Sequence, residues 1–193
     1  MASSPLLSVS EAHFNFFSDY EVTIDKPIDE VFEVLGKGSH MEKPVRLSKL
    51  CAKFELVRSD RVCLTKSEQL SESYLVRAQP TATQIPAEDR LLPRQFFHLE
   101  ELVPIFLGFK QRVYIDGAQT WDEEAKVALY ESDTGTVLVW KLRRFEEVEK
   151  GGKKKTKVHE VIKGRCPTLL RWIVQRETTD KHKEHMDTYH KLF

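Results

Sequence analysis

Two carboxylates stand on predicted strand faces that are otherwise apolar. Glu160 shares such a face with Val158 and Ile162, and Glu131 holds the same kind of position earlier in the chain. A carboxylate is costly to bury unless it is paired. If one of the two lies in a cavity, desolvation raises its pKa and makes it a general acid or base near neutral pH.

A cation stands in a comparable position, because Arg144 shares a predicted face with Trp140. In a catalytic interpretation, Arg144 stabilises an enolate. In a structural interpretation, Arg144 pairs with Glu131 or Glu160, or all three lie at strand ends that are already wet. The sequence leaves both interpretations open.

A second acid–base pair is predicted upstream. If the segment around His98 is a strand, His98 and Glu100 share a face and could exchange protons. The alternative is a solvated face, with Leu99 and Glu101 directed to the other side.

The last helix is rich in histidine. His182 and His185 are three residues apart and share a face, and Tyr189 follows one turn later. A zinc site needs a third ligand and no HExxH pattern occurs, so we expect no metal. His182 and Tyr189 then either line a cavity or belong to a charged, solvated helix end.

Aromatic side chains supply candidates for an apolar lining, although aromatic residues at such spacing also form ordinary cores. The candidates are Trp140, Tyr130 and Phe106. The chain has neither a GxGxxG nor a GxxxxGK[ST] pattern, so we expect no nucleotide and no other cofactor.

The composition narrows the class of protein. The chain has 193 residues, 30 basic and 30 acidic side chains and three widely spaced cysteines. A net charge of zero disfavours nucleic acid as a partner, and no apolar run approaches the roughly 20 residues of a membrane span. The N-terminus makes a poor signal peptide, and the cysteines fit a reducing compartment, so we expect a cytoplasmic protein.

Periodicity predicts the elements that must position these side chains. We expect a loose tail over 1–12 and one domain over 13–193. The predicted elements are a strand over 14–24, a helix over 28–35, a short helix within 46–57, a long loop over 69–94 at the cavity mouth, a hairpin turn at Asp116-Gly117, strands over 126–132, 136–148 and 156–164, and a final helix from Thr168 to about Lys191.

Several blocks together resemble the START-like superfamily (polyketide cyclase and lipid-transfer proteins, also called SRPBCC). The blocks are VTIDKPIDEVFEVL near the start, then ALYESDTG, VLVWKLRRFEE and VHEVIKG. The resemblance covers most of 14–193 and looks closest to uncharacterised fungal members. The Gly-rich loop of the birch-pollen-allergen branch is absent, and the segment 69–94 is longer than in minimal members, which implies a remodelled cavity mouth.

The resemblance implies an α+β helix-grip fold, in which a curved antiparallel sheet wraps around the long C-terminal helix and encloses a cavity. It also implies a small hydrophobic ligand, such as a polyketide or terpenoid, and a cofactor-free cyclisation, dehydration or isomerisation. The alternative is a non-catalytic carrier of a lipid, sterol or pathway intermediate. The sequence is also compatible with a homodimer. A third interpretation is an interaction module that uses the basic run 153–157.

Overall fold

A curved antiparallel sheet is the centre of the fold. The computed structural model describes residues 7–10, 12–83, 89–106 and 109–193. Within these residues seven strands pair in the order β2-β9-β8-β7-β6-β5-β3. Their bounds are β2 Phe16–Ile24, β3 Cys51–Thr65, β5 Asp89–Phe106, β6 Phe109–Asp122, β7 Val127–Asp133, β8 Leu138–Lys150 and β9 Lys153–Arg165. A small second sheet pairs β1 (Leu7–Ser8) with β4 (Ser73–Tyr74).

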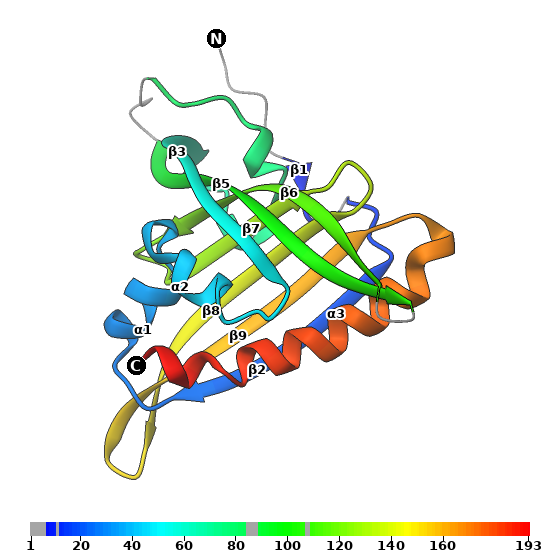
Figure 1. Cartoon of the computed structure of the whole chain (residues 1–193). Coiled ribbons are helices and arrows are strands. Elements are labelled where there is room, and N and C mark those ends of the chain that lie inside the picture. The colour runs from blue at the N-terminus through cyan, green and yellow to red at the C-terminus, as the bar shows by residue number, and fades with distance from the viewer. Residues whose placement is uncertain (1–6, 11, 84–88, 107–108) are drawn as a thin grey trace.

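A long helix, α3, lies across the concave side of the sheet (Figure 1). It runs over Arg171–Met186, and the short helices α1 (Ile28–Leu35) and α2 (Glu42–Val45) connect the edge strands β2 and β3. Short 3-10 turns complete the helical structure: η1 Gly38–His40, η2 Leu70–Glu72, η3 Val76–Ala78, η4 Thr168–Leu170 and η5 Tyr189–Leu192. The expected α+β architecture is therefore confirmed.

The opening strand and helix form as predicted. Residues of β2 alternate between sheltered and exposed positions from Phe16 to Ile24. Helix α1 begins after Pro27, whose extended backbone ends the strand, and it buries Val31, Phe32 and Leu35.

Both faces of the sheet are covered. On the concave face, side chains of α1 and of the C-terminal region pack with Phe145 and Val158. On the convex face, Leu129, Trp140 and Leu142 pack beneath Leu70 and Val76. Alternating strand residues are therefore buried on both sides, so an apolar face alone does not identify the side on which α3 lies.

The loop predicted over 69–94 has a different place and extent. The part of it before the gap, residues 69–83, contains η2, β4 and η3 and packs on the convex face, away from α3. Residues 89–94 already belong to β5, and residues 84–88 lie outside the described ranges. We call residues 66–83 the convex cover.

Two further predictions were wrong. Residues 51–57 begin strand β3 and form no helix, because they pair with residues 97–101 of β5. Asp116-Gly117 lies inside β6, and the chain turns only after Asp122. Gly117 makes room for the Phe97 ring, which lies over this position. A β-carbon at residue 117 would stand 2.2 Å from that ring.

No helix in the described ranges combines the length and hydrophobicity needed to cross a membrane.

Candidate active site on the concave face

A buried carboxylate occupies the centre of the concave face. Glu160 on β9 pairs in register with Tyr20 of β2 on one side and with Arg143 of β8 on the other. Residues opposite one another on adjacent strands point to the same side of a sheet, so the three side chains form one row facing α3. Glu160 is fully buried, and Arg143 is nearly so.

One carboxylate oxygen of Glu160 is held by strong donors. The Nε and Nη2 atoms of Arg143 each lie 2.5 Å from Oε2. The Tyr189 hydroxyl donates to the same oxygen over 3.3 Å and accepts from Arg143 Nη2 at 2.7 Å. Arg143 Nη1 also donates to the Leu35 carbonyl. Burial alone would raise the pKa of Glu160, but the charges of Arg143 and Lys141 hold it well below its ordinary value.

The other oxygen, Oε1, has side-chain nitrogen atoms nearby but accepts no hydrogen bond in the described part of the chain. His182 Nε2 lies 3.2 Å away, off the geometry of a hydrogen bond, and Lys141 Nζ lies 3.7 Å away. A buried acceptor without a donor is costly. Glu160 Oε1 therefore keeps unused acceptor capacity among the described residues.

Lys141 is a second basic side chain of the cluster, and its pKa is lowered. It comes from β8 two residues before Arg143, and its ammonium lies 4.6 Å from the ring centre of Tyr130, which it faces in register on β7. Burial lowers the pKa of Lys141, while the nearby charge of Glu160 partly offsets that effect. Burial also raises the pKa of Glu101, whose carboxylate feels the charge of Lys141. A lysine with a lowered pKa can act as a base.

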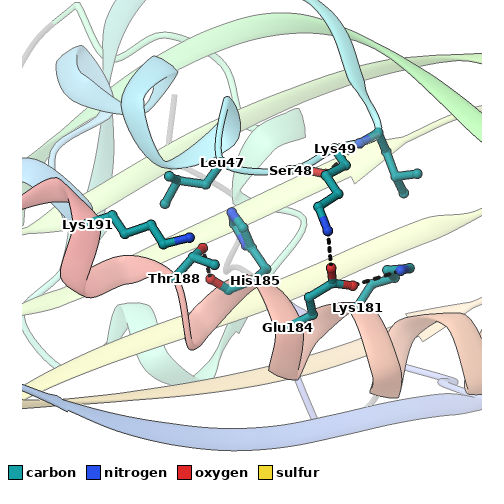
Figure 2. A pocket seen from close by; sticks show the side chains of 9 residues that line it. Leu47, Ser48, Lys49, Lys181, Glu184, His185, Thr188 and Lys191 are labelled. Carbon is teal, nitrogen blue, oxygen red and sulfur yellow. Dashed lines mark hydrogen bonds and ion pairs between the residues drawn. The ribbon is translucent and has the colours of Figure 1, made fainter.

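A cavity of about 170 Å³ opens between α3 and the segment that joins α2 to β3 (Figure 2). Its walls come from residues 47–50 on one side and from Lys181, Glu184, His185, Thr188 and Lys191 on the other. Glu184 joins the two walls, because it pairs with Lys49 at 3.0 Å and with Lys181 at 2.8 Å.

His185 connects this cavity with the buried cluster. Its side chain lines the cavity, and its ring packs edge-on against Tyr189. The Nε2 atom lies 2.7 Å from the Pro44 carbonyl, so Nε2 carries the hydrogen and Nδ1 is the acceptor nitrogen. Burial, helped by the charge of Lys141, lowers the pKa of His185 to about 4. The imidazole is therefore neutral at pH 7.

Solved structures with the same architecture are found by comparison, although no protein-family model and no curated protein matches the sequence. Norcoclaurine synthase from Thalictrum flavum, in truncated form, aligns over 100% of this chain and 97% of its own, with a TM-score of 0.52 and 11% identity. The protein TTHA0849 from Thermus thermophilus aligns over 91% and 94%, with a TM-score of 0.52 and 14% identity. The chain has the START-like helix-grip fold. Identities this low support the fold and leave the reaction open.

A third structure shares the helix-grip fold. It is Thalictrum flavum norcoclaurine synthase in complex with dopamine and hydroxybenzaldehyde, with a TM-score of 0.53 and 11% identity over 91% of this chain and 84% of the other.

The helix grip brings together only some of the side chains singled out from the sequence. Glu160, His182 and Tyr189 meet on the concave face, and Tyr130 lies there beside Lys141. Their roles stay predictions. The side chain of Phe106 lies outside the described residues.

Glu131 lies on the opposite face of the sheet. Its Oε2 accepts from the backbone N–H of Arg77 in η3 at 2.6 Å, and its Oε1 accepts no hydrogen bond from any described residue. Burial raises the pKa of Glu131 to about 7, although backbone donors of the convex cover act in the other direction. Trp140 shares this face, and its Nε1 donates to the Ser73 carbonyl at 3.0 Å.

Arg144 also lies on the convex face. It lines a broad groove of about 650 Å³ at the edge of the convex cover, together with Lys66 and Arg90. It forms no ion pair with Glu131, Glu160 or any other described residue. The cation that pairs with Glu160 is its neighbour Arg143, because adjacent strand residues point to opposite faces.

His98 and Glu100 face the solvent on the outer side of β5. His98 pairs with Asp116 at an exposed position, and Glu100, whose side chain is 21% exposed, pairs with the exposed Arg112. The structure therefore agrees with the solvated-face interpretation, and it directs Leu99 inward.

Reasoning from the sequence missed Lys141 and Arg143, and it noticed His185 without selecting it. The signal was present in β8, where both alternating sets of residues contain large apolar side chains: Trp140 and Leu142 on one face, Val139 and Phe145 on the other. Such a strand is buried on both sides, so a charge on either face is a candidate for the site. In the described ranges no three potential ligands converge on a metal site.

Proposed function

We propose that this protein binds a small, largely apolar carbonyl compound, such as a polyketide or terpenoid, between the concave face and α3. We further propose that it guides a cofactor-free cyclisation, dehydration or isomerisation. The proposal rests on the position of Lys141. Its amine is sheltered, lies 3.7 Å from Glu160 Oε1 and 4.6 Å from the ring centre of Tyr130, and has a lowered pKa.

The proposed chemistry is proton transfer at a carbon next to a carbonyl. In its unprotonated form, Lys141 Nζ takes the proton, the C–H electron pair becomes the enolate, and the new ammonium stabilises the enolate oxygen. Arg143 stays protonated and holds Glu160 and Tyr189 in place. The aromatic wall of Phe97 and Tyr130, stacked at 5.1 Å, would hold a flexible substrate in a reactive conformer.

The fold comparison gives this proposal an analogy. One helix-grip neighbour was solved with dopamine and hydroxybenzaldehyde, a small aromatic amine and a small aromatic aldehyde. An aromatic carbonyl compound is therefore a reasonable first probe for this chain.

A non-catalytic carrier is the second candidate. It is favoured by the saturation of Glu160 Oε2, which three donor groups from Arg143 and Tyr189 already satisfy. A carboxylate paired in this way is a structural group, and it would leave the concave face to bind a ligand without changing it.

The test uses 2-acetonaphthone, an aryl methyl ketone whose methyl protons exchange slowly in water. Native mass spectrometry measures binding, and the uptake of deuterium from D₂O measures enolisation. We expect the wild type to bind the ketone and to speed its exchange, and Lys141→Met to bind it without exchange. Lys163→Met is the matched control, because Lys163 also lies over an aromatic ring, Trp140, but on the convex face.

The outcomes separate the candidates. Binding without faster exchange in the wild type supports the carrier. Equal exchange in Lys141→Met and Lys163→Met contradicts the role of Lys141. Absence of binding to 2-acetonaphthone and to a panel of longer polyketones contradicts the ligand class.

A further inference from the structure

The turn η4 and the start of α3 expose large apolar side chains. Leu169 is 87% exposed, Trp172 66% and Ile173 46%, and Leu170 beside them is also exposed. Farther along, His182, Met186 and Tyr189 face the sheet and are buried. The turn η4 and the first turn of α3 therefore present a cluster of large apolar side chains to the solvent, and scattered single exposures do not form such a cluster.

The chain around this corner is basic. Residues 163–176 contain four basic side chains, Lys163, Arg165, Arg171 and Arg176, and no acidic one, although Lys163 itself lies on the convex face over Trp140. Arg165 and Arg171 form no ion pair with any residue in the described ranges. Arg176 lies 3.8 Å from Asp180 in an exposed pair, which is worth little.

We propose that this corner, the segment 163–176, docks on the surface of an anionic phospholipid bilayer. Tryptophan and leucine side chains gain free energy at the boundary between headgroups and acyl chains, and arginines beside them reach the phosphates. Each basic residue near an anionic membrane adds to the attraction. The net charge of the whole chain is zero, so the attraction is local to this corner.

Two other occupants fit less well. A second copy of the chain would place the same arginines against one another, because a two-fold interface is made of the same patch twice. A nucleic acid would satisfy the arginines but would give Leu169 no apolar partner.

Docking at this corner leaves the cavity open. The cavity is lined by residues 47–50 and by side chains of the segment 181–191, whereas the exposed apolar residues lie at the other end of α3 (Figure 1). A bound membrane would therefore cover neither wall of the opening.

The test measures co-sedimentation with vesicles of phosphatidylcholine, with and without phosphatidylserine, and follows the emission of Trp172. We expect binding only with phosphatidylserine, a blue shift that Trp172→Phe abolishes, and weakening as salt is raised. Trp172→Ala with Leu169→Ala should weaken binding about tenfold or more. Arg171→Gln with Arg176→Gln should weaken it about fivefold per residue.

Two control variants separate this corner from general effects. Lys153→Gln with Lys154→Gln removes charge from the β8–β9 hairpin tip, and Tyr114→Ala removes an exposed aromatic ring from β6. Neither should change binding. The proposal is overturned if vesicles do not bind, if the hairpin-tip variant loses binding equally, or if sedimentation velocity shows that Trp172→Ala turns a dimer into a monomer.

Discussion

Arg143 and Glu160 face one another across β8 and β9, and their side chains form a buried ion pair with 2.5 Å between Nη2 and Oε2. Tyr189 from η5 completes the contact, so the pair fastens the C-terminal segment to the sheet.

Breaking this pair on one side should be strongly destabilising. Glu160→Ala or Arg143→Ala leaves an uncompensated buried charge, and we expect a loss of about 3–5 kcal/mol in the free energy of unfolding. Urea denaturation measures it. His98→Ala, at an exposed ion pair, should change stability by less than about 0.5 kcal/mol. Equal small effects at Glu160 and His98 would contradict the structural role of the pair.

The double variant Arg143→Met with Glu160→Leu tests the same pair differently. Because both charges are removed together, it should cost less than the sum of the single variants. Strict additivity would mean that the two side chains do not interact.

Glu131 should make stability depend on pH. Its pKa in the folded protein is about 7, above the ordinary value of 4.5, so the folded state keeps a proton that the unfolded state has lost. The contribution is full below pH 4.5 and is lost as the pH rises through 7, by roughly 3 kcal/mol. Glu131→Gln should remove this dependence and should become the more stable form at pH 8.

The measurement is the difference in unfolding free energy between the wild type and Glu131→Gln from pH 4.5 to 8. Other titrating groups cancel in that difference. A difference that does not change with pH would contradict a raised pKa of Glu131 in the folded protein.

His185 should stay neutral well into the acid range. Its pKa of about 4 lies below the ordinary 6.5, so the unfolded chain binds a proton before the folded protein does. Its contribution to stability is full above pH 6.5 and is lost as the pH falls through 4. Imidazole NMR should show one histidine that titrates near pH 4, and His185→Gln should remove that signal. A histidine set that titrates entirely above pH 5.5 would contradict it.

Arg94 should hold the convex cover against the sheet. This buried guanidinium pairs with Asp60 at 2.8 Å and donates to the carbonyls of Val76 and Gln79 at 2.6 and 3.0 Å. Lysine keeps the charge but cannot make this set of bonds. We expect Arg94→Lys to speed limited proteolysis within residues 70–83 several-fold.

Arg61→Lys is the matched control for this experiment, because Arg61 is an exposed residue one position along β3 from Asp60. Cleavage at the same rate in both variants would show that Arg94 does not hold the cover.

Local sequence patterns correctly predicted many of the strands and the first helix. Alternation over β2, the switch to helical spacing after Pro27 and the strands β7 to β9 follow from short-range rules of backbone geometry, and each formed close to its predicted bounds. The same rules failed at residues 51–57, where pairing with β5 overrode an apolar spacing that suggested a helix.

The sequence by itself determined which residues share a strand face, such as Glu160 with Val158 and Glu131 with Leu129. Only the tertiary structure decided which face meets α3, because both faces of the sheet are apolar and the convex cover buries one of them. That choice separates Glu131 and Arg144 from Glu160, and it places Arg143 and Lys141 in the site. The period of two along a strand determines which side chains share a face. The packing of segments distant in the sequence determines what each face of the sheet contacts.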